Sequence, residues 1–553
     1  MRHRRVRHIS TAAFVCAAVT LLPGSAAAHP ADCGGRLTEA PNAERFSDWT
    51  GGNSSCGSAA SMGSFGGSNA RSVAGPARKP ATRAAQRMKT GALKKIGHEK
   101  LMSRGMNSAI AVHGDYAYVG SRTDGGHPGQ HQGGILVVDI SDPSDPTLLG
   151  RPFDAKPGES SRELRVWKSQ DILIVLNTNC GAGPLLHHCT QSSISNIRFY
   201  DIAGANATRP RLLNQLDVDT HEFFLWQDPA NRERALIFAG NAGSTCATRG
   251  GVPSCPFSVW DISPVRNGQP PTTSYSGLYP YSRFPALPEP VQKPTGGLHS
   301  LTISNDGSRA YFALLTGGFA VVDVSEFAAG APFPQPRPIT SNEARPVWAG
   351  PGAHSAAKLW GRDWAWVSDE VYGTATGADH GCPWGWARMI RITDPQAPTI
   401  EGEYREPEND PSTCDERNPP RTSYSAHNPT LTPNIAFTTW HSGGMEAVSI
   451  QRARRPYQLA EFTPKPLDHV MLEDPRLSSD PDTGRREKVV MWSYPIIRDG
   501  LIYVIDLRNG LYVLEYRGPF KKEVRRIRFL EGNSNQGNAL CYEPVGRAPR
   551  YCR

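Results

Sequence analysis

Residues 134–146 read GILVVDISDPSDP, and this stretch decides the fold. A glycine precedes four apolar residues that form a short strand, Asp139 ends the strand, and two prolines mark a turn. The pattern recurs, with changes, at residues 196–202, 256–262, 318–324, 387–392, 444–450 and 510–516. The position of Asp139 recurs at spacings of 62, 60, 62, 68, 58 and 66 residues, so the chain contains seven copies of one unit.

Each copy has a second apolar segment just upstream, rich in aromatic and β-branched residues. These segments are residues 116–120, 172–176, 235–239, 310–314, 364–368, 435–439 and 501–505. A further apolar stretch precedes each of them and another follows each proline turn, which gives four short strands per unit. Four antiparallel strands per repeat are typical of a β-propeller blade, because radial repetition protects the sheet edges. We therefore expect an all-β, seven-bladed β-propeller over residues 96–530, with Leu93–Met102 as a candidate strand that closes the ring.

The unit as a whole resembles the LVIVD-repeat proteins. The resemblance rests on Tyr116-Ala-Tyr-Val followed by Gly-x-x-Val-Val-Asp-Ile-Ser-Asp-Pro, and it covers roughly residues 105–530. It is strongest at 116–150 and 310–325, whereas the units at Arg391 and Ser449 lack the acid. The resemblance implies a propeller-like extracytoplasmic protein of the secreted bacterial type, and it implies little chemistry.

The residues before the repeats have a different character. Residues 1–28 carry four arginines, an apolar run from Thr11 to Leu22 and the small residues Ala26–Ala28. This order predicts a secretory signal peptide cleaved near Ala28, and the apolar run is too short for a transmembrane segment. Residues 29–95 are rich in Gly, Ser and Ala and then basic, which predicts a flexible, disordered leader. We expect a solvated linker there, with association of the basic part with an anionic cell surface as the alternative.

Charge and cysteine content narrow the class of protein. The formal charge of +8 falls to about +4 without the signal peptide, too small a surplus to indicate nucleic-acid binding. Cys16 lies in the expected signal peptide, so ten of the eleven cysteines remain in the mature chain. An even number of cysteines in an exported chain predicts disulfides rather than metal thiolates. The expected neighbouring pairs are Cys33 with Cys56, Cys180 with Cys189, Cys246 with Cys255, Cys382 with Cys414, and Cys541 with Cys552, the last in a polar tail of residues 531–553.

Loop lengths predict one elaborate face of the propeller. The loops that join strands two and three, and those that join blades, are long, whereas the others are mostly short. Because loops on a rigid scaffold carry function, we expect an unknown ligand or protein partner to bind at this long-loop face. Trp384 and Trp386 lie in one of these loops. They are candidates for exposed residues that contact carbohydrate or peptide, and the alternative is that they cover the channel mouth.

A histidine recurs at the start of the expected innermost strand in four consecutive units. The four residues are His221, His299, His354 and His427, whereas units one, two and seven place Asn107, Ser161 and the region of Met491 there. Innermost strands line the channel of a propeller, so we expect four imidazoles around its mouth. The ends of the second strands reach the same level and add Asn177, Asn241, Asp369, Glu370, His441 and Asp506 to the binding face.

Two hypotheses for function follow. The first is a secreted binding or scaffold protein in which the histidines hydrogen-bond neighbouring blades. The second is a metal-dependent enzyme, redox or hydrolytic, in which the four histidines hold one transition metal ion, Fe, Cu or Zn. Glu222, Asp369 and Glu370 are then the candidates for outer-sphere or general-base roles. The acids Asp139, Asp201, Asp261 and Asp323 precede proline or serine turns, and we interpret them as turn caps.

Overall fold

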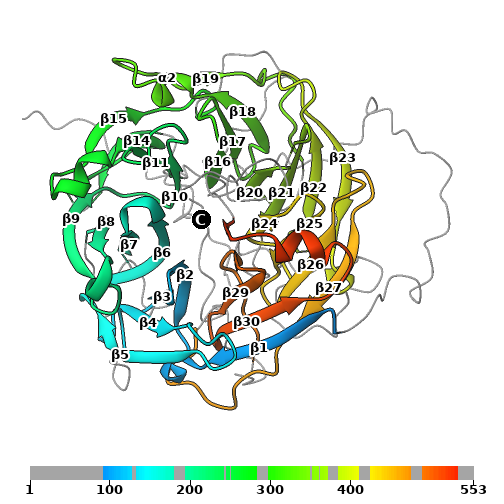
Figure 1. The fold of residues 1–553 in the computed structure, drawn as a ribbon. Coiled ribbons are helices and arrows are strands. Elements are labelled where there is room, and N and C mark those ends of the chain that lie inside the picture. Colours follow the sequence, from blue (N-terminus) through cyan, green and yellow to red (C-terminus); the bar gives the residue numbers. More distant parts are fainter. Residues whose placement is uncertain are drawn as a thin grey trace, which may run out of the picture. The chain divides into compact units, whose positions relative to one another are not determined.

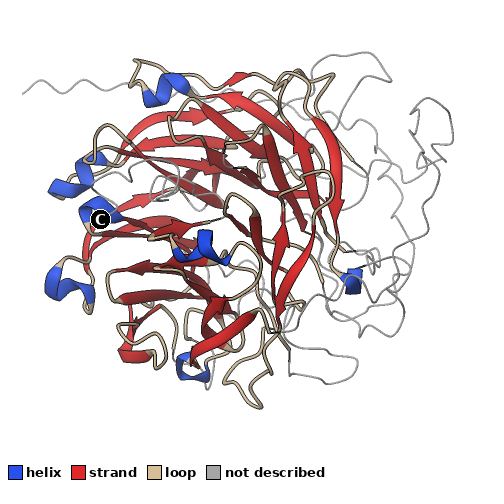
Figure 2. Cartoon of the chain, turned by 45° about the vertical axis from the view of Figure 1, so that its right-hand side comes forward, coloured by secondary structure: helices blue, strands red, loops and turns tan. Residues whose placement is uncertain are grey.

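The computed structural model describes residues 91–126, 132–179, 194–241, 245–249, 251–282, 297–348, 352–359, 361–370, 384–409, 424–474 and 488–532. The expected signal peptide, most of the leader and the tail beyond Gly532 lie outside these residues. The described residues form an all-β propeller of seven antiparallel sheets arranged radially around a channel (Figures 1 and 2). The predicted fold class is confirmed.

The seven blades follow one another along the chain, each listed from its innermost strand outward. Blade 1 contains β2 (Asn107–His113), β3 (Tyr116–Ser121), β4 (Ile135–Asp139) and β5 (Thr147–Phe153). Blade 2 contains β6 (Glu159–Trp167), β7 (Ile172–Asn179), β8 (Asn196–Asp201) and β9 (Arg211–Asp217). Blade 3 contains β10 (Glu222–Gln227), β11 (Ala235–Gly240), β14 (Phe257–Asp261) and β15 (Thr272–Gly277). Blade 4 contains β16 (Ser300–Ile303), β17 (Arg309–Ala313), β18 (Phe319–Asp323) and β19 (Arg337–Pro338).

The remaining blades complete the ring. Blade 5 contains β20 (Gly352–Lys358), β21 (Trp364–Glu370), β22 (Ala387–Arg391) and β23 (Thr399–Tyr404). Blade 6 contains β24 (Pro429–Leu431), β25 (Ile435–Thr439), β26 (Met445–Ser449) and β27 (Tyr457–Phe462). Blade 7 contains β31 (Phe529–Glu531), β28 (Ile496–Arg498), β29 (Leu501–Asp506), β30 (Gly510–Tyr516) and β1 (Leu93–Glu99). The short helices are η2 (Leu101–Ser103), η3 (Lys168–Gln170), η4 (Gly204–Ala207), η5 (Ser263–Asn267), α2 (Ser325–Ala328), η6 (Pro407–Asn409) and α3 (Lys521–Arg525).

The repeated sequence pattern corresponds to the third strand of every blade. In β4 the four residues Ile135 to Val138 are all buried, because the sheet packs against a neighbouring blade on both faces. A strand buried on both faces has a continuous apolar run rather than an alternating one, which is why the pattern is visible in the sequence. The outermost strand β5 is largely exposed, and its sequence signal is correspondingly weak.

The acids that end these strands cap the following turns, as predicted. Asp139 Oδ1 accepts a hydrogen bond from the backbone N–H of Ser141 at 2.8 Å. The same bond recurs at Asp201 with Ala203, at Asp261 with Ser263 and at Asp323 with Ser325. An Asp side chain that accepts from the N–H two residues ahead forms an Asx turn, so these acids have a structural role.

Two terminal segments complete blade 7. Strand β1 pairs antiparallel with β30, so the start of the described chain provides the outermost strand of the last blade. Within the expected segment Leu93–Met102, residues Leu93–Glu99 thus form a strand of blade 7, and Leu101–Ser103 form the helix η2. On the channel side, β31 pairs with β28 and adds a fifth strand that the sequence did not predict.

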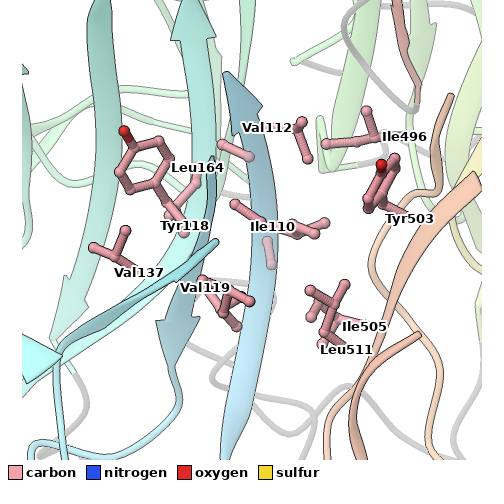
Figure 3. Close-up of a cluster of buried hydrophobic side chains, with 14 of the residues drawn as sticks. Ile110, Val112, Tyr118, Val119, Val137, Leu164, Ile496, Tyr503, Ile505 and Leu511 are labelled. Atoms are coloured by element: carbon pink, nitrogen blue, oxygen red, sulfur yellow. The ribbon is translucent and has the colours of Figure 1, made fainter. Parts of the chain in front are cut away.

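The core consists of apolar clusters between adjacent blades. Figure 3 shows the cluster where blades 1, 2 and 7 meet, with Ile110, Leu164, Tyr503 and Leu511 pointing toward one another. Burial of this apolar surface between all neighbouring blades makes the ring rigid. A rigid ring fixes the positions of the side chains at its channel mouth.

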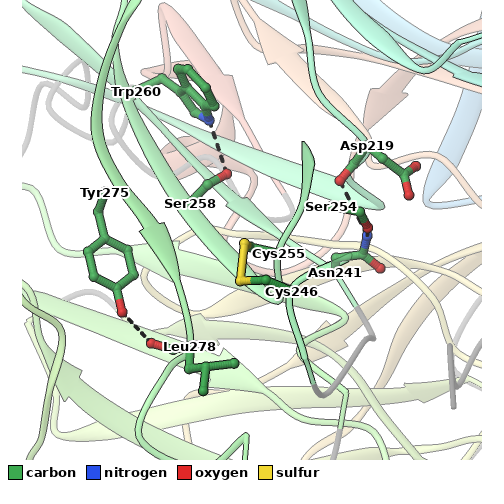
Figure 4. The surroundings of a disulfide bond; sticks show 9 residues. All are labelled: Asp219, Asn241, Cys246, Ser254, Cys255, Ser258, Trp260, Tyr275 and Leu278. Atoms are coloured by element: carbon green, nitrogen blue, oxygen red, sulfur yellow. Dashed lines mark hydrogen bonds between the residues drawn. A yellow bond between two sulfur atoms is a disulfide. The ribbon is translucent and has the colours of Figure 1, made fainter. Parts of the chain in front are cut away.

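One of the five predicted disulfides lies within the described residues. Cys246 is bonded to Cys255 and fastens the hairpin of β12 (Ala247–Arg249) and β13 (Val252–Ser254), which connects the second and third strands of blade 3 (Figure 4). Asn241 Nδ2 donates to Ser254 Oγ at 3.0 Å and anchors the base of this hairpin.

The other four predicted pairs lie outside the described residues, so the pairing of their cysteines stays a prediction. They are Cys33 with Cys56, Cys180 with Cys189, Cys382 with Cys414, and Cys541 with Cys552.

Candidate metal centre

The four predicted histidines lie at the starts of the innermost strands of blades 3 to 6. The backbone N–H groups of His221, His299 and His427 donate to carbonyls of the second strands, at 2.9, 3.0 and 2.8 Å. His354 lies in a β-bulge of β20, between the paired residues Ala353 and Ser355. Each histidine is therefore held by the strand pairing of its own blade, and the ring of blades brings the four together.

The four imidazoles form a continuous row around the channel mouth. Successive ring centroids are 4.3 Å apart for His221 and His299, 3.9 Å for His299 and His354, and 3.9 Å for His354 and His427. The Nε2 atoms of His221 and His299 are separated by 2.9 Å. Two ligand nitrogens at right angles on a metal with bonds of about 2.1 Å are about 3 Å apart, so this spacing suits a shared ion.

Glu370, the last residue of β21, lies against this row. Its Oε1 is 3.0 Å from His427 Nε2, and its Oε2 is 3.3 Å from His354 Nε2 and 4.0 Å from His299 Nε2. His441, which follows β25, adds a fifth imidazole, with its Nε2 3.5 Å from Glu370 Oε1. Glu222 approaches from blade 3, with its Oε1 3.9 Å from His299 Nδ1 and 3.8 Å from His354 Nε2.

Hydrogen bonds at the outer nitrogens fix the orientation of two of the rings. His427 Nδ1 contacts the backbone carbonyl of Trp492, which can only accept, so Nδ1 carries the proton. His354 Nδ1 lies 2.6 Å from Ser355 Oγ, whose own proton is donated to Asn428 Oδ1 at 2.8 Å. In their neutral forms both rings therefore present an Nε2 without a proton to the centre, as an outer hydrogen bond does for a metal-binding histidine.

Burial favours the neutral form of His299, His354 and His441. His299, His354 and His427 are almost completely buried, and His221 is the partly exposed member of the four. Burial lowers the pKa of His299 to about 3, and it lowers the pKa values of His354 and His441 as well. Burial, reinforced by the nearby charge of Glu163, raises the pKa of Glu222 well above its usual range.

This arrangement fits a transition metal ion. Unprotonated nitrogens of His354 and His427 face a carboxylate that also only accepts, so acceptors confront one another across 3.0 to 3.3 Å. Glu222 Oε2 and His354 Nε2 are buried without a hydrogen bond to any described residue. A cation bound between these groups would satisfy all of them, and neutral imidazole with an outer carboxylate suits iron, copper, nickel or zinc. The atoms of His299, His354 and Glu370, and those of Glu370, His427 and His441, lie within 4.8 Å of one another.

Several predicted site residues lie elsewhere and have structural partners. Asp369 forms a buried ion pair with Arg388 and accepts from the Trp348 indole N–H at 3.2 Å. Asn177 accepts from Ser161 and donates to Asn196 at 3.0 Å. These contacts engage Asp369 and Asn177 in the scaffold, and the catalytic role of Asp369 stays a prediction.

Two further residues expected on the binding face also stabilise the scaffold. Asp506 accepts backbone N–H groups of Val490, Arg508 and Asn509, so it caps a turn. Asn241 anchors the disulfide-bonded hairpin described above.

Of the two interpretations of the loop tryptophans, exposure on a binding face is wrong. Trp384 is 3% exposed and Trp386 is 8% exposed. Trp386 lies between two guanidinium groups, with Arg388 at 4.3 Å and Arg405 at 3.8 Å from its ring centroid. Cation–π contacts and burial use the faces that a carbohydrate would need, so neither residue is a surface stacking platform.

Arg162 is the site residue that sequence comparison missed. It lies in a β-bulge of β6 between Ser161 and Glu163, and blade 5 places His354 in the equivalent bulge. The extra residue of a bulge shifts the alignment of the repeats by one residue. Alignment of the repeats without the bulge therefore places Ser161, instead of Arg162, at the position equivalent to His354. Only a sequence signal for the β-bulge in blade 2 could have identified Arg162 as a residue of the site.

Comparisons with solved structures find distant similarities only. Sqt1 from Saccharomyces cerevisiae is 8% identical, with 76% of this chain and 98% of that chain covered and a TM-score of 0.42. A putative 6-phosphogluconolactonase from Bacteroides fragilis is 12% identical, with 78% and 96% covered and a TM-score of 0.40. A protein from Lactobacillus plantarum is 12% identical, with 65% and 84% covered and a TM-score of 0.40. At these values the likeness concerns the fold, and it carries no argument about function.

The remaining findings concern curated proteins, membrane-spanning helices and family models. No curated protein matches the chain. Among the described residues, none of the helices has the length and apolar character needed to cross a membrane. Residues 104–152, which contain blade 1, match the family model of the LVIVD repeat. The chain therefore carries an LVIVD repeat on a seven-bladed β-propeller, as the resemblance in its sequence predicted.

Proposed function

We propose that this protein is a metal-dependent enzyme, redox or hydrolytic, whose single transition metal ion is held at the channel mouth. His221, His299, His354 and His427 are the proposed ligands, and Glu370 would supply the facing carboxylate. Among the described residues their ligand atoms belong to three overlapping groups, which are His221 with Glu222 and His299, His299 with His354 and Glu370, and Glu370 with His427 and His441. The bound ion would supply Lewis acidity or a redox couple at this position. The proposal rests on one observation above all: the Trp492 carbonyl fixes His427 so that its unprotonated Nε2 faces Glu370 at 3.0 Å.

The surrounding residues support this function by orienting the ligands. Ser355 and Asn428 hold His354 through a relay of hydrogen bonds, and rigid strand pairing positions every ligand backbone. Such outer contacts fix ring orientation and raise ligand basicity. Glu222, buried 3.8 Å from His354 Nε2, is positioned to exchange a proton with a molecule bound at the centre.

The test is elemental analysis of the protein purified from the secreted fraction without chelators. We expect near-stoichiometric iron, copper or zinc in the wild type, and its loss in the His299→Ala/His354→Ala double variant. His98→Ala is the matched control, because His98 is a partly buried histidine that contacts the Asn509 carbonyl far from this row. Absence of metal from wild type that has been offered Fe, Cu and Zn would refute the proposal.

A binding or scaffold role at the long-loop face is the second candidate. The disulfide between Cys246 and Cys255 favours it, since that bond stiffens a hairpin between the second and third strands of blade 3. Binding of a partner at the long-loop face can be distinguished from metal-dependent activity, because the partner would still bind the metal-free double variant. Retention of a partner by wild type and double variant alike would support binding as a separate function.

The proposed location is outside the cell. Its support is the arginine-rich start, the apolar run and the Ala26–Ala28 segment, together with the disulfide of blade 3. Sequencing of the amino terminus of secreted protein should give a start just after Ala28. A protein that keeps Met1 and stays in the cytoplasm would contradict this location. Association of the basic leader with the cell surface is a separate proposal, and a leader that does not bind anionic surfaces would contradict it.

A further inference from the structure

Arg162 occupies the position in blade 2 that a histidine occupies in the blades that follow. Its backbone lies in the bulge of β6, at the level of His354 in β20, and Ser108 Oγ of blade 1 donates to its carbonyl at 2.7 Å. The ring of residues at the channel mouth therefore contains four imidazoles on one side and a guanidinium beside His221. The strand pairing of blade 2 directs this guanidinium to the row of proposed ligands.

The guanidinium contacts the most accessible ligand. Arg162 Nη1 is 3.1 Å from His221 Nδ1, and its Nη2 is 2.8 Å from His221 Nε2. His221 is the partly exposed histidine of the four, whereas His299, His354 and His427 are buried. Arg162 is itself partly exposed, so this side of the row is where a molecule from solvent would reach the metal.

Trp492 forms the opposite wall of this region. The Arg162 guanidinium lies 5.8 Å from the indole centroid, and Trp492 meets His427 edge to face with centroids 5.3 Å apart. Arg122 lies 5.6 Å from the same indole, but it is ion-paired with the buried Asp474 at 2.9 Å. Glu163, which follows Arg162, is ion-paired with Arg165 at 2.6 Å. Arg122 and Glu163 are thus engaged in scaffold contacts, whereas Glu222 of the site interacts electrostatically with Arg162.

A metal ion and Arg162 compete for the same lone pair. A neutral imidazole has one unprotonated nitrogen, and the metal needs the Nε2 that Arg162 now contacts. Metal binding therefore requires the guanidinium to turn away from His221, while its backbone keeps it beside the ion. Two cations at this separation repel one another unless an anion lies between them.

We propose that Arg162 anchors a carboxylate-bearing small organic substrate next to the metal, between the guanidinium, His221 and the Trp492 ring. The inference rests on the proposed metal centre and names the substrate class of that site. The two parallel N–H groups of one guanidinium match the two oxygens of a planar carboxylate. A dianionic phosphate would call for a second cation, and Arg122 is engaged with Asp474.

The test uses protein loaded with Co²⁺, whose visible absorption reports the ligands of the ion, titrated with sodium acetate at constant ionic strength. We expect saturable spectral change in wild type. In Arg162→Met the acetate Kd should rise about tenfold or more, because a hydrogen-bonded charge pair is lost. Arg162→Lys should lie between the two, since it keeps the charge without the paired donors. Arg151→Met, an exposed arginine of β5, is the matched control and should behave as wild type.

Cobalt content is measured in the same samples, so the two proposals fail in different ways. Wild type that binds no Co²⁺ would overturn the metal centre. Stoichiometric Co²⁺ with an acetate Kd equal in wild type and Arg162→Met would overturn the anchor alone. Tighter binding of phosphate than of acetate to wild type would overturn the assignment to carboxylates.

Discussion

A buried carboxyl group in blade 6 should contribute strongly to the pH dependence of stability. Glu446 of β26 is 2% exposed and lies near Glu406, which is 1% exposed. Burial raises the pKa of Glu446 from 4.5 to about 8, and it raises the pKa of Glu406 as well. The Tyr404 hydroxyl donates to Glu446 Oε2 at 2.8 Å and Gln458 Nε2 donates to Oε1 at 2.6 Å, which limits the shift without cancelling it.

The direction of the effect follows from proton binding. Between pH 4.5 and about 8 the carboxyl is protonated in the folded protein and ionised in the unfolded chain. The folded state therefore binds more protons, and the free energy of unfolding falls as the pH rises through this interval. At about 1.4 kcal/mol per unit, the full interval corresponds to a loss of about 5 kcal/mol for Glu446 alone.

Glu446→Gln should remove this loss. An uncharged amide of the same size keeps the contacts with Tyr404 and Gln458, since both partners can reverse their hydrogen bonds. We expect urea unfolding of wild type and variant to give similar free energies at pH 5, and a variant that is several kcal/mol more stable at pH 9. Glu343→Gln, the same change at an exposed position between β19 and β20, is the control. Parallel pH profiles for wild type and Glu446→Gln would refute the reasoning.

Three further predictions concern the metal, the core and the disulfide. Metal at about 1,000 times its Kd should raise the unfolding free energy by about 4 kcal/mol, with no such rise in His299→Ala/His354→Ala; equal melting of both proteins with metal and with EDTA would contradict it. Ile110→Ala should lower the free energy of unfolding in urea by about 3 kcal/mol, because Ile110 is fully buried where blades 1, 2 and 7 meet. A decrease below about 1 kcal/mol would show that the neighbouring side chains of Figure 3 move to fill the cavity. Opening the bond between Cys246 and Cys255 by a double Ala variant should cost about 2.5 kcal/mol from loop closure, and an unchanged unfolding midpoint would show that the hairpin frays independently of the blade.

The propeller could be predicted from the sequence because packing between blades requires a continuous apolar run in the third strand of each repeat. Ile135 to Val138 are buried on both faces, so selection for an apolar run is continuous there. The outermost strands are half exposed, and β31 has only three residues, so neither has a periodic signal of its own. Histidines of adjacent blades were predicted to meet because a ring must place equivalent positions side by side.

The parts of the site that sequence could not supply depend on local backbone geometry and on distant partners. A bulge in β6 moves Arg162 into the ring, and bulges leave no fixed sequence signature. Trp386 is covered by Arg388 and Arg405, a contact that requires the fold to be known. Asp369 and Glu370 are adjacent in sequence, yet they point to different partners, because successive residues of a strand project to opposite faces.

Closure of the ring by β1 constrains how the chain reaches its folded state. His98 of β1 contacts the carbonyl of Asn509, which is 411 residues later in the sequence. Strand β1 can therefore pair with β30 only after nearly the whole chain has been synthesised. Joining ends separated by that length costs about 5 kcal/mol of loop entropy beyond a constant term. Until blade 7 has been synthesised, blade 1 and the unfinished ring expose unpaired edges, a state prone to association with other chains. Passage of an unfolded chain through an export pore followed by folding outside would keep that interval away from the crowded cytoplasm, with ring closure as the late step.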